Sequence, residues 1–185
     1  MRAAEEGVLL LCCALPEDTV RPLTLPQFEA LGRRVRLLGS GASDPLGEVT
    51  ARELRRLGYD EGQCARILAL LARREKLRRY LTAAERAGIR PVTRLSASYP
   101  ARLWQALGTR CPAVLFAKGD PVLASARCIT VVGSRELTAE GRTFAETAGR
   151  LIAEAGLTLC SGGAIGADLA AQEACLAHGG SAVIF

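Results

Sequence analysis

Apolar side chains recur at helical spacing in the first half of the chain and gather into short unbroken runs in the second half. The helical spacing predicts four helices, over Val8–Leu15, Leu25–Leu38, Thr50–Leu57 and Glu61–Ala87. Thr50 and Glu53 have the spacing of a capping box at the start of the third helix, and Gly88 can end the fourth. A turn-rich break at Gly39–Pro45 separates the second helix from the third.

From Ile89 onward the pattern is that of strands alternating with helices. We predict strands over Ile89–Thr93, Ala113–Ala117, Cys128–Val132, Leu157–Cys160 and Ser181–Phe185, and helices over Ala101–Leu107, Thr138–Ala155 and Asp168–His178. The β-branched run Cys128–Val132 is typical of a parallel strand that is covered on both faces. The last three strands and the two helices between them form half of a doubly wound sheet, so we predict an α/β fold with a Rossmann-like parallel sheet. We place the domain boundary after residue 88, between a small all-helical domain (1–88) and a Rossmann-like domain (89–185).

The composition is that of a globular protein, with 49% hydrophobic and 23% charged residues among 185. The longest apolar run, Val8–Leu15, has eight residues, whereas a membrane-spanning helix needs roughly 20. We therefore expect a cytoplasmic protein with no membrane partner. Seven cysteines lie among aliphatic residues, without a C-x-x-C motif and with a single histidine in the chain. They predict buried free thiols, with no disulfide, metal site or cofactor.

Charge is distributed unevenly along the chain, whose formal net charge is +5. Residues 1–125 hold 20 Lys and Arg against 13 Asp and Glu, whereas residues 126–185 hold 4 against 6. The positive segment fits either a solvated helical surface or attraction to a polyanion, and charge alone does not separate these two interpretations.

Two loops that follow neighbouring parallel strands carry the candidate chemistry. They have the sequences G-S-R-E at 133–136 and S-G-G-A-I-G at 161–166. Ligands of such sheets bind where the strands end; glycine lets backbone N–H groups approach an anion, and arginine presents a fork that suits phosphate. The helix after the second loop adds the positive end of its dipole. The pair favours a site for phosphate or a nucleotide backbone over two tight turns alone.

No catalytic constellation is evident in the sequence, so we expect a binding protein and not an enzyme. Neither loop has the G-x-G-x-x-G or G-x-x-x-x-G-K-[ST] signature, and Ser134 and Ser161 lack a G-x-S-x-G elbow. His178 is predicted at the far end of its helix, on the surface or as a cap. Asp168 is predicted in the first turn of that helix, where an acidic residue more often interacts with the helix dipole than assists catalysis.

A specific combination of motifs runs through the second half of the chain. It consists of V-V-G-S-R at 131–135 and S-G-G-A-x-G-x-D at 161–168, preceded by Y-P-x-x-L at 99–103 and V-L-F-x-K-G-D at 114–120. These motifs resemble the DNA-processing protein A family (DprA, also called Smf). The resemblance is close over residues 89–185, and residues 1–88 are similar in character to the family's amino-terminal SAM-like helical domain.

The resemblance implies a non-enzymatic protein that binds single-stranded DNA, protects incoming DNA and helps to load a RecA-type recombinase during natural transformation, as a homodimer in the full-length protein. It also implies that the two loops line a pocket for the DNA backbone, with binding assigned to Gly133, Ser134, Arg135, Ser161, Gly162, Gly163, Ala164 and Gly166. Three residues depart from the family's pattern A-R-G-I-D followed by A-H, because Ile165, Ala167 and Gln172 stand at these positions.

Two other classes of function stay open at this point. A Rossmann-like nucleotide-binding protein or a lysine-decarboxylase-like phosphoribohydrolase would resemble the chain in fold, and the latter has a P-G-G-x-G-T-x-x-E loop. Here Ser161 replaces the proline, Asp168 stands where the threonine would follow, and Ala171 replaces the glutamate. The remaining alternative is an interaction module whose helical domain binds a protein.

We also expect residues 1–185 to be a fragment, because three parallel strands are half of a doubly wound sheet. The strand Cys128–Val132 would then be left as an edge, unless Ala113–Ala117 covers it.

Overall fold

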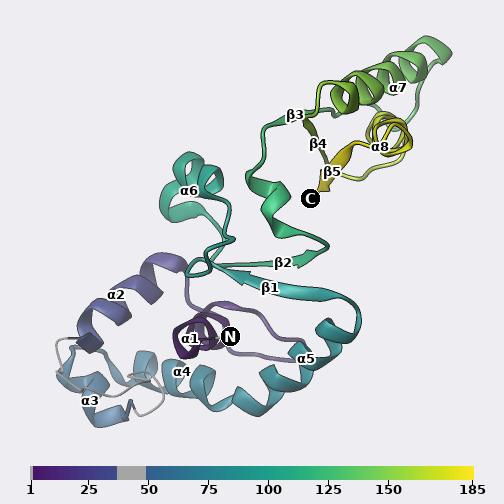
Figure 1. Cartoon of the computed structure of the whole chain (residues 1–185). Coiled ribbons are helices and arrows are strands. Elements are labelled where there is room, and N and C mark those ends of the chain that lie inside the picture. The colour runs from purple at the N-terminus through teal and green to yellow at the C-terminus, as the bar shows by residue number, and fades with distance from the viewer. Residues whose placement is uncertain (1, 37–48) are drawn as a thin grey trace. The chain divides into compact units, whose positions relative to one another are not determined.

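The computed structural model describes residues 2–36 and 49–185 (Figure 1). These residues fall into two compact units, Met1–Pro121 (unit 1) and Val122–Phe185 (unit 2). The turn-rich break predicted at Gly39–Pro45 lies outside the described residues, as do the last two residues of the helix predicted over Leu25–Leu38.

Unit 1 begins with five helices. They are α1 (Ala3–Cys12), α2 (Leu25–Arg36), α3 (Ala51–Arg56), α4 (Glu61–Ala72) and α5 (Arg74–Arg86). The capping box at Thr50 is confirmed, since Glu53 N donates to Thr50 Oγ1 (3.3 Å) and Thr50 N donates to Glu53 Oε2 (2.8 Å). The first helix starts five residues earlier than the predicted Val8 and ends at Cys12, because Arg2 N donates to the Glu5 carboxylate (2.9 Å) ahead of the apolar run.

The helix predicted over Glu61–Ala87 is divided in two at Arg73, so that prediction is wrong in its middle. Arg73 is 9% exposed, and its guanidinium donates to the carbonyl oxygens of Leu10 and Cys13 and to the carboxylate of Asp18. A buried guanidinium is costly unless acceptors surround it. The break at Arg73 is explained by these acceptors, which come from residues about 60 positions earlier in the chain.

A two-stranded antiparallel sheet completes unit 1. It consists of β1 (Ile89–Thr93) and β2 (Val114–Lys118), and the chain between them forms α6 (Ala101–Leu107) and the 3-10 turn η1 (Gly108–Arg110). Val92 and Tyr99 are buried in one cluster with Leu25, the first residue of α2. This shared cluster joins the two-stranded sheet to the helices within unit 1, and the domain boundary after residue 88 stays a prediction.

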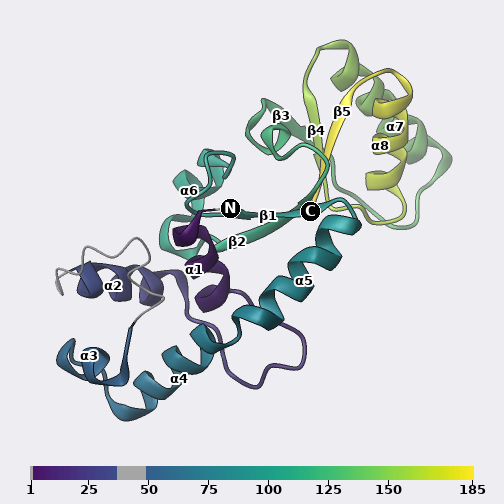
Figure 2. The same ribbon diagram turned by 60° about the horizontal axis from the view of Figure 1, so that its bottom comes forward.

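Unit 2 contains a three-stranded parallel sheet with the order β3-β4-β5. A second 3-10 turn, η2 (Pro121–Ser125), leads into β3 (Cys128–Thr130), α7 (Ala139–Glu154), β4 (Thr158–Ser161), α8 (Ala167–Ala177) and β5 (Ser181–Ile184). Helices α7 and α8 pack against β4 and against one another, beside the sheet in Figures 1 and 2. Their backbones approach closely at Gly149, where a Cβ would lie 2.1 Å from the carbonyl oxygen of Ala171.

Strand β3 is an edge of this sheet within the described chain, and all three of its residues are exposed. The prediction that Cys128–Val132 is covered on both faces is therefore wrong, and Ile129 is 45% exposed. Ala113–Ala117, the segment named as a candidate to cover this edge, lies within or beside β2, which pairs with β1, so the expectation that Cys128–Val132 is left as an edge is confirmed within the described chain.

All seven cysteines are free thiols, but they do not share one environment. Cys13, Cys64, Cys111 and Cys175 are buried, Cys12 and Cys160 are half-buried, and Cys128 is exposed on β3. The prediction of buried thiols is confirmed for most of them and is wrong for Cys128, because β3 lies at the sheet edge. Within the described part of the chain, no helix combines the length and the apolar character that crossing a membrane requires.

Candidate nucleic-acid interface

The two glycine-containing loops of unit 2 lie against each other at the carboxyl ends of β3 and β4. The amide of Ala167 donates a hydrogen bond to the carbonyl oxygen of Ser134 (3.0 Å), which joins the second loop to the first. Gly166 has a φ of +94°, and a Cβ there would lie 2.2 Å from Ser134 O and 2.7 Å from the Cα of Arg135. Only glycine permits this approach. The structure therefore brings the residues predicted on the two loops together.

The buried side chain of Asp168 connects the two loops through hydrogen bonds. Its side chain is in the first turn of α8 and the residue is 5% exposed. The carboxylate accepts hydrogen bonds from the amides of Gly133 (3.3 Å), Gly162 (3.1 Å) and Ala164 (3.5 Å), and so connects both loops to α8. The sequence predicted a partner of the helix dipole at this position. The bond to the first loop was missed, because it joins residues 35 positions apart.

The surroundings of Asp168 favour its charged form. Burial raises the pKa of this carboxyl, but the hydrogen bond from Ala164, the nearby Ser161 side chain, and the bonds from Gly133 and Gly162 together hold it below the ordinary value of 3.8. Ser161 ends β4, and its hydroxyl is buried with no partner at hydrogen-bond geometry among the described residues. A negative charge thus lies directly behind the two loops at neutral pH.

This geometry changes which backbone groups can meet an anion. The amides of Gly133, Gly162 and Ala164, which the sequence placed in the phosphate cradle, donate to Asp168 instead. Within the described chain, five amides on the loops donate to no protein acceptor: those of Ser134, Arg135, Gly163, Ile165 and Gly166. These five groups are the backbone donors that remain for a ligand.

Arg135 is the cation of the first loop. Its side chain is exposed and forms no ion pair or hydrogen bond within residues 2–36 and 49–185. The neighbouring Ser134 is also exposed, and its hydroxyl accepts a hydrogen bond from Glu136 N (3.1 Å), which fixes the turn. The unpaired guanidinium and the unpaired amides are donors that suit an oxyanion, and the exposed carboxylate of Glu136 lies on the same loop.

The three departures from the family's pattern have different consequences. Ile165 is 68% exposed on the second loop, so an apolar side chain replaces a cation at the surface. Ala167 is buried beneath the first loop, where a Cβ on Gly133 would come within 2.7 Å of it. Gln172 is buried in α8, with its Nε2 lacking a hydrogen-bond partner in the described chain. Only the change at Ile165 alters the exposed loop directly.

The groups that could perform catalysis lie apart from one another. His178 is exposed as the C-cap of α8, at the opposite end of that helix from the loops, and its Nδ1 lies 2.8 Å from Ala174 O. This confirms the predicted surface or cap position. Among the described residues, no group of three or more His, Cys, Asp and Glu side chains is placed to hold a metal ion.

The second half of the chain matches a family model described as DNA recombination-mediator protein A, over residues 90–185. Among solved structures, the chain is similar to the X-ray structure of DNA processing protein A (DprA) from Streptococcus pneumoniae, with 21% sequence identity and a TM-score of 0.56. That similarity covers 88% of this chain but 57% of the other, so the chain spans little more than half the length of its structural relative. No curated protein sequence matches the chain. The family match includes both loops and the strands that precede them.

Proposed function

The chain belongs to the DNA recombination-mediator protein A family, and from this premise we propose that it binds single-stranded DNA through the paired loops of unit 2. The family match confirms the resemblance carried by the sequence motifs, and the structural similarity confirms the Rossmann-like fold. The family's description places the chain among proteins of DNA processing and recombination. Within that role, the proposed function is to protect incoming DNA and to help load a RecA-type recombinase during natural transformation, in the cytoplasm.

The observation that carries this proposal is the contact between the two loops. It places the Arg135 guanidinium and five unpaired amides on adjoining segments, and every one of these groups is a donor. A DNA backbone supplies a row of phosphate acceptors that such donors can meet without reading the bases. Aromatic residues are 4% of the chain, so we expect phosphate contacts to dominate and sequence preference to be weak.

A binding role fits the site better than a catalytic one. The Asp168 carboxylate is engaged by three amides, the Ser161 hydroxyl is buried, and His178 lies at the other end of α8. Ser134 and Glu136 are both exposed on the first loop, but within the described chain no hydrogen bond joins the Ser134 hydroxyl to the Glu136 carboxylate. The position where a phosphoribohydrolase would carry its glutamate is Ala171, which is fully buried in α8.

The proposal is tested by the anisotropy of a fluorescent oligo-dT titrated with the protein at several salt concentrations. Binding should weaken linearly on a plot of log affinity against log salt, as expected for phosphate contacts. Arg135→Ala should weaken binding by about 10-fold to 150-fold, since a charged hydrogen bond contributes about 1.5–3 kcal/mol. The matched control is Arg142→Ala, which removes an exposed arginine of α7 that pairs with Glu146 at 3.7 Å and should leave affinity unchanged. An affinity that does not depend on salt would contradict the proposal.

The partners belong to the same proposal. The loops would hold the strand, and a RecA-type recombinase would be recruited to the complex by a homodimer of the full-length protein. Recombinase assembly on oligo-dT, measured with and without the protein, tests this step. If Arg135→Ala weakens DNA binding and leaves the stimulation of assembly unchanged, the loops are not the relevant DNA site.

A further inference from the structure

The segment between α5 and Asp120 carries basic side chains and no acidic ones. Residues 87–119 contain no Asp or Glu and five cations: Arg90, Arg94, Arg102, Arg110 and Lys118. Arg90 pairs with Asp120 (3.9 Å), whereas the other four form no ion pair within the part of the chain that the structure describes. Arg102, Arg110 and Lys118 are exposed. The segment itself contributes only positive charge to unit 1; the carboxylates beside it are Asp120, which pairs with Arg90, and Glu5, which accepts a hydrogen bond from Ser96 Oγ (2.8 Å).

Arg94 occupies an unusual position in this segment. Its guanidinium carbon lies 3.9 Å from the centroid of the Trp104 ring and 5.5 Å from that of Tyr99. Its Nε is buried without a hydrogen-bond partner, and its other side-chain nitrogens donate to no acceptor within the described chain. A guanidinium stacked on an aromatic ring keeps its donors directed along its edge. Only Nε is buried among these donors, so the terminal nitrogens of Arg94 remain available to an acceptor that a ligand could supply.

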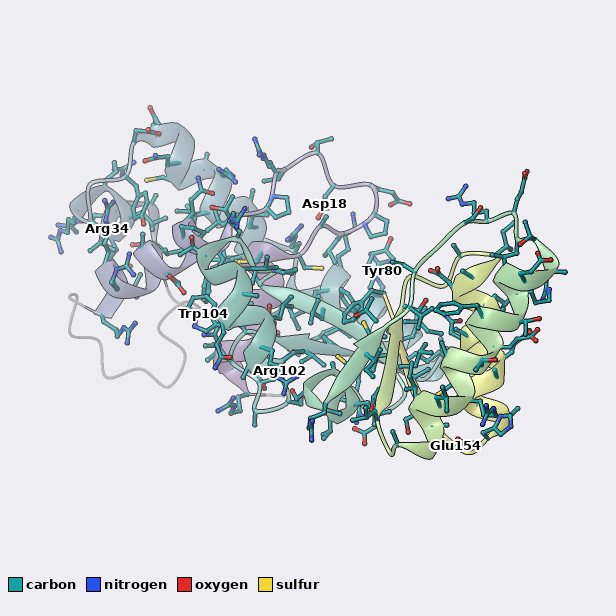
Figure 3. The ribbon with its side chains drawn as sticks, turned by 90° about the horizontal axis from the view of Figure 1, so that it is seen from above. Asp18, Arg34, Tyr80, Arg102, Trp104 and Glu154 are labelled. Atoms are coloured by element: carbon teal, nitrogen blue, oxygen red, sulfur yellow. The ribbon has the colours of Figure 1, made fainter. Side chains whose placement is uncertain are left out.

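The surrounding backbone holds this arginine in place. Arg94 N donates to Ala113 O (2.8 Å), Thr93 N donates to Ser96 Oγ (3.0 Å), and the Tyr99 hydroxyl donates to Pro112 O (2.6 Å). Trp104 comes from α6, which also carries Arg102, and both side chains are labelled in Figure 3. The stacked pair is therefore fixed before any ligand arrives, which lowers the entropy lost on binding.

We propose that Arg94, Trp104, Arg102 and Arg110 (the α6 surface) form a second binding site for single-stranded nucleic acid. The inference deepens the proposed function, because it gives the same ligand a contact outside the two loops of unit 2. Phosphate oxygens would accept hydrogen bonds from Arg94, and an unpaired base would stack on the guanidinium plane or on the part of Trp104 left exposed. A duplex offers the phosphates but keeps its bases stacked within the helix, so the site should favour single strands.

Trp104 gives a direct way to observe this surface, because it is the only tryptophan in the chain. Oligo-dT carrying a terminal fluorophore is titrated with the full 185-residue protein, and its anisotropy reports binding anywhere on the molecule. A parallel titration of the protein with unlabelled oligo-dT follows the emission of Trp104, which reports binding at the α6 surface. We expect the oligonucleotide to quench this emission in a saturable and salt-sensitive manner.

Three charge-removing variants test the assignment. Arg94→Gln should raise the oligo-dT concentration that half-quenches Trp104 by about tenfold, as the loss of a charged hydrogen bond does. Because Arg94 is half-buried, Arg102→Gln provides a second variant at an exposed residue. It should raise the half-quenching concentration of oligo-dT by about threefold, because one phosphate contact is lost. Arg52→Gln removes an exposed charge from α3 and should change the half-quenching concentration by less than about twofold.

The two readouts separate the failure of this inference from that of the proposed function. If the anisotropy rises while Trp104 emission stays constant, the α6 surface does not bind the strand: this inference is overturned and the proposed function is not. If neither signal changes, both proposals are overturned. Quenching of equal strength by poly-glutamate would overturn the assignment to nucleic acid in favour of an acidic polypeptide. In Arg135→Ala, quenching of Trp104 should persist while the overall affinity falls.

Discussion

Replacing Gly166 with alanine should force apart the two loops of unit 2. Gly166 is the N-cap of α8, with φ +94° and ψ −130°, a backbone conformation that side-chain-bearing residues rarely adopt. Its added Cβ would lie 2.2 Å from Ser134 O, in contact with backbone that cannot rotate away as a side chain would. The loop must therefore shift, and the bond from Ala167 N to Ser134 O should break.

The loss of stability expected for Gly166→Ala can be estimated from these features. The backbone conformation contributes about 1–3 kcal/mol and the lost hydrogen bond about 1 kcal/mol, so the free energy of unfolding should fall by roughly 2–4 kcal/mol. Gly179→Ala is the matched control at the other end of α8. Gly179 also has a positive φ (+73°), but nothing lies within 4 Å of its added Cβ, so only backbone strain of about 1 kcal/mol applies.

Urea unfolding of both variants, followed by far-UV circular dichroism, measures this difference. The emission of Trp104 reports unit 1 and should show the same midpoint in both variants. Gly166→Ala should also weaken binding of oligo-dT, because the displaced loops no longer hold Arg135 and their unpaired amides side by side. Equal destabilisation by the two substitutions, or wild-type DNA affinity in Gly166→Ala, would refute the role assigned to the contact between the loops.

Three other substitutions test separate parts of the structure. Arg73→Ala should lower the unfolding free energy of unit 1 by about 3 kcal/mol, measured by urea unfolding with Trp104 emission, because buried carbonyl oxygens at the end of α1 lose their donors; an unchanged midpoint contradicts this. Arg135→Lys should restore only part of the oligo-dT affinity lost in Arg135→Ala, since lysine lacks the planar fork; full recovery would show that charge alone suffices. The folded pKa of Asp168 lies below 3.8, so its stabilisation is present above that value and is lost as the pH falls through the folded pKa. Asp168→Asn should therefore be less stable at neutral pH and lose less stability on acidification from about pH 5 to pH 2, and an acid response as steep as wild type would contradict the assignment.

Features that depend on neighbouring residues could be predicted from the sequence. Helical spacing and a capping box located α2 and α3, and short runs of mostly apolar residues located the strands of both sheets. The break between α4 and α5 could not be predicted in this way, because the sequence pattern predicts Arg73 to be exposed like the other arginines of a basic helix. Its acceptors lie in residues 10–18, and no local pattern indicates that they surround it.

The same distinction explains the outcome at the site. Glycines and an arginine after neighbouring strands predicted that two loops would meet, and the structure places them in contact. An acidic residue in a first helical turn predicted an interaction with the positive end of a helix, but not that Asp168 would bind the amide of Gly133 on the other loop. Likewise, the β-branched character of Cys128–Val132 indicates a capacity for burial, whereas actual burial depends on a covering element that a single segment does not specify.

The distribution of charge over the two units explains why a second contact would matter. Unit 2 carries the paired loops, yet it holds four arginines against six acidic residues, and three of its loop amides donate to Asp168. Unit 2 therefore has few unpaired cationic groups, and it contributes little long-range attraction for a polyanion in salt solution. The excess of cations lies in unit 1, where residues 87–119 contain no carboxylate. If the chain binds a DNA strand as proposed, the long-range attraction should come mainly from unit 1, and the loops of unit 2 should act at short range, where Arg135 and the unpaired amides can orient a phosphate.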